Sequence, residues 1–247
     1  MRESKALLES LQVVADRLRP AAVWQGSGKP VDAAKDDYVF ELLCFFHIAM
    51  AAQTRFRVAV RGKVELGKVP IARWPKKPGL KANFSYLDLR SREESTAEIS
   101  YQLCPGIEIA DRFGKARSPD ANLLRGLAGP NPNHQDLHAC WDAKFILNSA
   151  ARVSDVAIAD FAYTYGVLGS PTAPSAWTTA VELPVFRHSG VMTNGKESTE
   201  PSDALLSAGI QETANFPHAP LTRPTISLVE PTNPEVASST VATKEVD

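Results

Sequence analysis

The sequence predicts an α/β fold in which helices flank a central mixed β-sheet, with an extra helix at the N-terminus and a flexible C-terminal tail. Three observations predict it: an apolar helical stretch at residues 38–52, a series of strand-like segments between residues 55 and 147, and a second helical pattern at 153–168. The chain has 247 residues, of which 44% are hydrophobic, so it can bury a substantial core and is too apolar to be disordered throughout.

Two helices are expected before the first strand. Apolar residues recur at helical spacing over residues 4–18, with Ser4 as a capping residue. The stretch at 38–52 is shorter than the roughly 18–20 residues needed to cross a bilayer and contains Glu41 and His47, so we interpret residues 37–53 as a buried helix. The N-terminus lacks the pattern of a signal peptide, and the three cysteines cannot build a disulfide framework. These features predict a cytoplasmic protein without a membrane partner.

The remaining elements follow in order along the chain. Strands are expected at 55–60, 83–89, 97–103, 120–124 and 137–147, where residues are apolar or alternate in polarity. A helix is expected at 153–168, a further strand at 179–186 and a short helix at 202–215. Residues 216–247 form a proline-rich acidic segment that we expect to be disordered, which leaves one domain at residues 1–215.

Charge is distributed unevenly, although the formal net charge is only −1. Residues from 197 onward carry −6, residues 1–196 carry +5, and the segment 55–81 alone carries +8. Basic residues interleaved with aromatic ones are typical of a surface that binds a phosphate backbone, although a solvated face that binds nothing has the same pattern. The candidate nucleic-acid-binding residues are Arg55, Arg57, Arg61, Lys63, Arg73, Lys76, Lys77 and Lys81.

A second group of candidate residues lies on two strands joined by a turn. Asp120 follows Pro119 at the start of one strand, and Asp142 and Lys144 lie on one face of the other strand because strand side chains alternate. A hairpin folded symmetrically about Asn131 would place position 120 opposite position 142. Two facing carboxylates repel each other unless a cation neutralises them, so this register indicates a cation site.

Oxygen ligands of this kind favour Mg²⁺, which typically takes one or two carboxylates together with waters and substrate phosphate oxygens; Mn²⁺ can substitute for it. Such a metal can polarise a phosphodiester and lower the pKa of a bound water. A neighbouring lysine such as Lys144 can hold or deprotonate the attacking water and offset the charge of the transition state. The pattern is therefore compatible with metal-dependent hydrolysis of phosphodiester bonds.

These residues resemble the motif of the PD-(D/E)xK nuclease superfamily, whose restriction-endonuclease-like core has the order α, β, β, β, α, β. The matching residues are Pro119-Asp120 and Asp142-Ala143-Lys144, with aspartate where glutamate is more usual, and the resemblance covers roughly residues 36–190. The family often adds a glutamate from the helix before the strands, a role that Glu41 matches. The resemblance implies an Mg²⁺-dependent endonuclease in which Glu41, Asp120 and Asp142 bind metal and act in catalysis with Lys144.

The resemblance also implies a partner, which we expect to be DNA rather than RNA, and roles in restriction or anti-phage defence. A second copy of the chain or a partner protein would supply specificity. The alternative is a non-catalytic protein on the same fold that binds nucleic acid or acts as a scaffold. An Asp–Lys pair at a strand end can also be purely structural. A zinc site is disfavoured, because the cysteines and histidines at Cys44, His47, His134, His138 and Cys140 match no recognised finger spacing.

Overall fold

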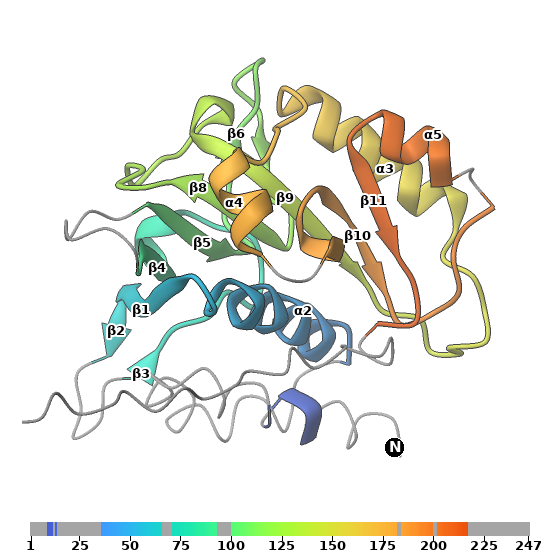
Figure 1. Cartoon of the computed structure of the whole chain (residues 1–247), viewed down its shortest axis with the longest axis horizontal. Helices are drawn as coiled ribbons and strands as arrows, with labels where there is room; N and C mark the ends of the chain where they lie inside the picture. The colour runs from blue at the N-terminus through green and yellow to red at the C-terminus, as the bar shows by residue number, and fades with distance from the viewer. Residues whose placement is uncertain are drawn as a thin grey trace, which may run out of the picture.

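The computed structural model describes residues 9–11, 13, 36–65, 71–92, 100–181, 184–199 and 202–216. Its centre is a seven-stranded mixed sheet in the spatial order β1-β4-β5-β8-β9-β10-β11 (Figure 1). The strands are β1 (Phe56–Gly62), β4 (Ser85–Ser91), β5 (Tyr101–Pro105), β8 (Ala121–Arg125), β9 (Leu137–Lys144), β10 (Ser189–Thr193) and β11 (Ile210–Thr213). The predicted α/β class with a mixed sheet is confirmed.

Two short two-stranded ribbons stand beside this sheet. One joins β2 (Val64–Glu65) to β3 (Ile71–Ala72), and the other joins β6 (Ile109–Ala110) to β7 (Ala116–Arg117). The second ribbon comes immediately before β8, so its position is tied to the start of that strand.

The type of strand pairing changes once across the main sheet. Pairing is antiparallel from β1 through β4, β5 and β8 to β9, whereas β9, β10 and β11 run parallel to one another. In the β8–β9 pair Ala121 lies opposite Trp141 and Asn122 opposite Cys140, which is the register predicted from the turn. Asp120 and Asp142 therefore occupy facing positions one residue beyond the last pair. A bulge between Leu123 and Leu124 shifts the register only toward the loop.

Each face of the sheet packs against its own helices. On one face the core contains α2 (Asp36–Ala52) and Trp177 of α4 (Ser175–Ala180). On the other it contains α3 (Asp155–Val167) and a residue of α5 (Ser202–Ser207). Figure 1 shows α2 on the opposite side of the sheet from α3 and α5. Strand residues alternate between these two cores, as the twofold period of a strand requires, so Trp141 joins the α2 core and Cys140 the α3 core.

The helix α2 is buried around nearly its whole circumference, which explains why its sequence is apolar on all sides. It contacts both β5 and β9. Glu41 is one of the few polar residues on this helix, and its side chain is only partly exposed. The helix predicted at 37–53 is thus confirmed, and its packing brings a carboxylate to the sheet.

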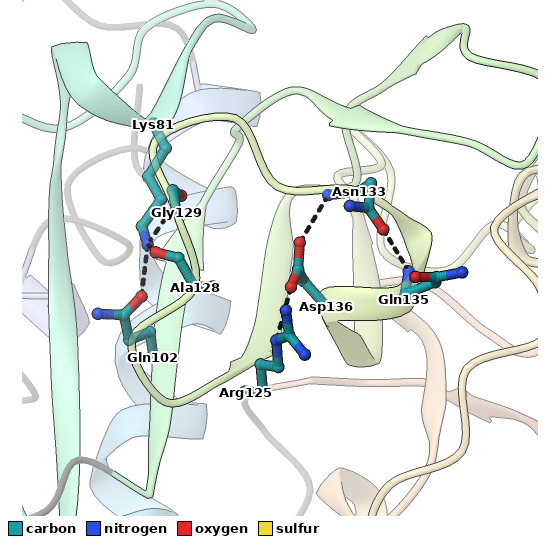
Figure 2. Close-up of polar contacts among 8 residues, drawn as sticks. All are labelled: Lys81, Gln102, Arg125, Ala128, Gly129, Asn133, Gln135 and Asp136. Atoms are coloured by element: carbon teal, nitrogen blue, oxygen red, sulfur yellow. Dashed lines mark hydrogen bonds and ion pairs between the residues drawn. The ribbon is translucent and has the colours of Figure 1, made fainter.

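The connection between β8 and β9 is braced by its own side chains (Figure 2). The Asn133 side chain caps a 3₁₀ turn by accepting from the backbone N–H of Gln135 at 2.8 Å, and the Asp136 carboxylate accepts from the backbone N–H of Asn133 at 3.0 Å. The other oxygen of Asp136 lies 2.7 Å from Arg125 Nε, at the end of β8. This turn therefore links the two strands and fixes the length of their connection.

The strands predicted between residues 55 and 147 are confirmed as β1, β4, β5, β8 and β9, with ends displaced by a few residues. The helix predicted at 153–168 is confirmed as α3, and the Ser154 side chain caps it by accepting from the backbone N–H of Ala157 at 3.2 Å.

Two predictions near the C-terminal end of the fold are wrong. The described residues of the segment 179–186 form no strand, because α4 ends at Ala180 and a 3₁₀ turn occupies Pro184–Phe186. The buried Trp177 indole donates to the carbonyl of Phe186 at 2.9 Å and holds this turn in place. The helix predicted at 202–215 ends at Ser207. Gly209 then adopts a φ of 82°, and the chain returns as β11.

Other expectations lie mostly or wholly outside the described residues. Residues 9–11 and 13 are helical, as expected for the first helix, and the rest of 4–18 is not described. The tail from residue 217 onward, which we expected to be disordered, lies outside the described residues. Among the described residues, no helix is long and apolar enough to cross a membrane.

Candidate functional site

The start of β8 and the end of β9 bring the two predicted aspartates together. Asp120 Oδ2 accepts from the backbone N–H of Ala143 at 2.8 Å. In return, Asp142 Oδ1 accepts a longer hydrogen bond, 3.4 Å, from the backbone N–H of Asp120. Each carboxylate thus binds the backbone of the other strand where regular pairing stops, so both acidic groups are held at one end of the sheet.

Two further contacts fix the backbone at Asp120. Its carbonyl accepts from the N–H of Gly106 at 2.9 Å, next to the end of β5. The fully buried Asn122 side chain donates to the carbonyl of Pro119 at 2.9 Å. Asn122 is a positioning residue that the sequence reasoning missed. The available signal was a polar residue inside an apolar strand, two positions after Asp120 and therefore on its face.

Lys144 completes the predicted motif through an ion pair with Asp142. Its Nζ lies 2.9 Å from Asp142 Oδ2, and the two side chains are 34% and 18% exposed. Burial alone would lower the pKa of Lys144, but Asp142, Asp120 and Glu41 together outweigh that effect and raise it. The ammonium is therefore charged at neutral pH and remains reachable from solvent.

Helix α2 supplies the third acidic side chain. Burial, together with the negative charges of Asp37 and Asp142, raises the pKa of Glu41 from 4.5 to about 7, although Lys144 opposes the shift. One turn further along the helix, the pKa of the buried Cys44 thiol is raised by burial and by Asp120 and Glu41. This turn of α2 therefore lies near the strand ends that carry Asp120 and Asp142.

The cluster contains more acidic groups than basic ones. Burial raises the pKa of Asp120 well above its ordinary value, and repulsion from Asp142 and Glu41 raises it further. Three carboxyl groups thus share one ammonium, that of Lys144. A cation bound beside Asp120 and Asp142 would relieve this repulsion.

The arrangement gives two facing carboxylates rather than a three-carboxylate centre. Nowhere in the described part of the chain do three or more His, Cys, Asp or Glu side chains come together in a way that could hold a metal ion. The expectation that Glu41 ligates the same ion as Asp120 and Asp142 is therefore not met by this arrangement. The predicted pair still fits Mg²⁺, which needs only one or two protein carboxylates.

Part of the predicted basic surface lies beside this cluster. Trp74 packs against Phe45 and Phe46 of α2 with ring-centroid distances of 5.6 and 5.4 Å, which anchors the loop that carries Arg73, Lys76 and Lys77. Pro75 in this loop lies so close to Gly106 that a Cβ there would come within 3.3 Å of it, and Gly106 is the residue bonded to Asp120. The three basic side chains are exposed. We call residues 73–77 the basic loop.

Two more of the predicted basic residues lie near the basic loop and two do not. Arg61 and Lys63 are exposed at the end of β1 next to Ser85, whose hydroxyl donates to the carbonyl of Lys63 and accepts from the N–H of Arg73. Arg55 and Arg57 are also exposed, but they lie at the opposite end of β1, where Phe56 pairs with Ser91. At about 3.3 Å per residue, the two ends of the strand are roughly 20 Å apart.

Lys81 does not belong to this surface and is a correction to the prediction. It is only 3% exposed, and its ammonium donates to the side chain of Gln102 and to the carbonyls of Ala128 and Gly129, at 2.6 and 3.5 Å for the two carbonyls (Figure 2). It also lies 4.6 Å from the ring centroid of Tyr86. Lys81 therefore has its donors committed inside the protein, where it ties the loop after β8 to β5.

For the competing zinc interpretation, the described residues contain no group of three or more His, Cys, Asp or Glu side chains that could hold the ion. His138 packs edge-on against Tyr101, with ring centroids 5.7 Å apart, away from the Asp142 end of β9. Comparison with protein-family models, with curated proteins and with solved structures finds no match to this chain.

Replacing Glu41 by glutamine is expected to stabilise the unliganded protein above pH 7. A carboxyl group whose folded pKa is raised from 4.5 to about 7 destabilises the fold progressively as pH rises through that range, because the folded state resists losing the proton. The Glu41→Gln variant should therefore match the wild type near pH 4.5 and exceed it by roughly 1–3 kcal/mol at pH 8. Thermal melts across pH measure this, with the exposed Glu197→Gln as control. An equal difference at both pH values would contradict the pKa assignment.

Proposed function

We propose that this protein is a metal-dependent nuclease of the PD-(D/E)xK type that hydrolyses phosphodiester bonds in DNA. The observation that carries the proposal is the pairing of Asp120 and Asp142 at one strand end, with the partly exposed Lys144 2.9 Å from Asp142. An acid pair and a lysine in this arrangement are costly to maintain at the edge of an apolar core unless they have a use. We further propose that the protein acts in the cytoplasm, in restriction or anti-phage defence.

The order of elements around the pair supports it. The helix α2 precedes the antiparallel strands β5, β8 and β9, then α3 follows, and β10 returns parallel to β9. The superfamily core has the order α, β, β, β, α, β; here β1 to β4 are inserted after the first helix, the β6–β7 ribbon between β5 and β8, and α4 between α3 and β10. We therefore propose a restriction-endonuclease-like core for residues 36–193.

The residues present suggest how the reaction would proceed. Asp120 and Asp142 would hold Mg²⁺, which when bound polarises the phosphodiester and lowers the pKa of a coordinated water. Lys144 would orient the attacking water and offset the charge of the transition state, since its ammonium stays protonated beside three carboxyl groups. Arg73, Lys76 and Lys77 would bind the phosphates that flank the scissile bond. Specificity would come from a second copy of the chain or from a partner protein.

The test is cleavage of supercoiled plasmid and of single-stranded DNA by the purified protein in Mg²⁺, Mn²⁺ or EDTA. We expect cleavage with either metal and none with EDTA. An RNA substrate of the same sequence separates the proposed DNA preference from general nuclease activity. Tight DNA binding without cleavage under any metal condition would instead support the non-catalytic alternative.

A further inference from the structure

The β6–β7 ribbon precedes Asp120 of the candidate site in the sequence. It leads through residue 118 and Pro119 directly to Asp120, and in Figure 1 it lies at the upper margin of the molecule, next to α3. Two backbone bonds fix its position: the N–H of Ala110 donates to the carbonyl of Pro132 at 3.1 Å, and the N–H of Arg112 donates to the carbonyl of Val167 at 3.2 Å. The ribbon is thus attached to the β8–β9 connection and to the end of α3.

Asp111 makes the tip of this ribbon a rigid structure. Its carboxylate accepts from the backbone N–H of Phe113 at 2.8 Å and from that of Lys115 at 2.9 Å, and it pairs with Arg117 Nε at 2.9 Å. Gly114 adopts a φ of 76°, which closes the turn. Asp111 itself is 3% exposed, so its charge is directed inward and is compensated by Arg117.

This rigid tip presents an aromatic ring and positive charge to solvent. Phe113 is 67% exposed, a large value for a phenylalanine that a tight turn holds in place. The Arg112 guanidinium lies 5.4 Å from the Phe113 ring centroid, and both Arg112 and Lys115 are exposed. On the neighbouring helix Tyr163 is 61% exposed and lies 5.3 Å from the guanidinium of Arg117. Asp160, one helical turn before Tyr163 on the same helix, is an exposed acidic residue.

We infer that the tip of the β6–β7 ribbon is a DNA-contacting element in which Phe113 stacks on a nucleobase while Arg112 and Lys115 bind the adjoining phosphates. The inference rests on the proposed nuclease function and names how the substrate is engaged. An exposed aromatic ring flanked by cations is the arrangement that binds a base and its backbone together. A protein partner that covered this patch with apolar surface alone would desolvate Arg112 and Lys115 without supplying a counter-charge, which is energetically costly.

The length of the intervening chain limits how far this contact can lie from the scissile bond, although the ribbon is bonded to the β8–β9 connection at the other end of these strands. Seven residues separate Phe113 from Asp120, and an extended chain of that length spans at most about 25 Å. DNA advances about 3.4 Å per nucleotide along one strand, so the stacked base would lie within about seven nucleotides of the bond that is cut. The Phe113 ring can stack on an unpaired base or insert between two base pairs, because single-stranded and duplex DNA both offer the face of a base.

The experiment uses the full chain carrying Asp142→Asn, to prevent cleavage, and DNA labelled with 2-aminopurine as single strand and as duplex. Phe113→Ala is expected to weaken binding about tenfold and to remove the change in 2-aminopurine fluorescence, whereas Phe113→Tyr should retain both. The matched control is Val156→Ala, which removes another exposed apolar side chain from the far end of α3. The double variant Lys76→Glu/Lys77→Glu should bind DNA more weakly and with a smaller salt dependence, because phosphate contacts are lost, and should keep the fluorescence change.

The outcomes are distinct. A Phe113→Ala effect confined to single strands assigns the contact to an unpaired base, and an effect on the duplex with enhanced 2-aminopurine emission assigns it to insertion between base pairs. If Phe113→Ala binds both DNA forms as tightly as its parent, with the fluorescence change intact, the inference is overturned and the nuclease proposal stands. If the parent protein binds neither form, the proposed function itself fails.

Discussion

Replacing Lys144 by methionine is expected to reduce DNA cleavage by at least about a hundredfold while leaving DNA binding nearly unchanged. Methionine keeps most of the length and apolar stem of lysine but removes the ammonium 2.9 Å from Asp142. The loss would therefore fall on the chemical step, where that charge orients water and stabilises the transition state. Single-turnover cleavage with Mg²⁺ separates this step from binding. Lys196→Met, at an exposed lysine outside the cluster, is the matched control.

Asp142→Asn should abolish cleavage by a different route. The asparagine keeps the size of the side chain, but it removes one of the two charges that would hold the metal and leaves Lys144 without its ion-pair partner. The wild type and Lys144→Met should therefore melt at a higher temperature when Mg²⁺ is added, because ligands that bind the folded state stabilise it, whereas Asp142→Asn should not. Cleavage that survives both substitutions would rule out this site as the catalytic centre.

Replacing Lys81 by methionine should destabilise the protein by about 2–4 kcal/mol, which corresponds to a lower melting temperature by roughly 5–10 °C. The variant leaves the buried Gln102 side chain and the carbonyl of Ala128 without the donor that now satisfies them. The matched control is Lys76→Met, which removes an exposed lysine and should leave the melting temperature within a degree or two. Each variant removes one positive charge, so a difference between their melting temperatures reports the buried contacts of Lys81 and not the change in net charge.

The same pair of variants separates the two roles that the sequence assigned jointly. Lys76→Met should weaken DNA binding without a loss of stability, whereas Lys81→Met should lose stability first. If Lys81→Met instead melts like the wild type and binds DNA more weakly, Lys81 contacts phosphate after all, and its buried contacts in the structure would carry no weight.

The residues of the candidate site were predictable because their placement follows from local rules. A turn rich in glycine, proline and asparagine sets the hairpin register, and register alone decides that Asp120 faces Asp142. The glutamate of α2 was recognisable because it interrupts an apolar helix. None of this required knowledge of distant contacts.

The errors have the opposite origin. The density of lysine and arginine along the chain does not reveal which way each side chain points. The 3₁₀ turn Lys81–Asn83 directs Lys81 into the protein, although its neighbours in sequence face solvent. The strand β10 has five residues, all buried, and no alternation, so its sequence carries no strand period. Its place in the sheet is decided by the parallel neighbours β9 and β11, which sequence patterns do not show.

The braced connection between β8 and β9 has a consequence for which changes the chain tolerates. Lys81 at one point and Asp136 at another fix how many residues separate the two strands. Gaining or losing one residue there would slide β9 by one position and turn Asp142 to the opposite face of the sheet. The side chains at the tip of this connection are thus free to vary, whereas its length is as strictly constrained as the acidic residues themselves, although it lies at the far end of both strands.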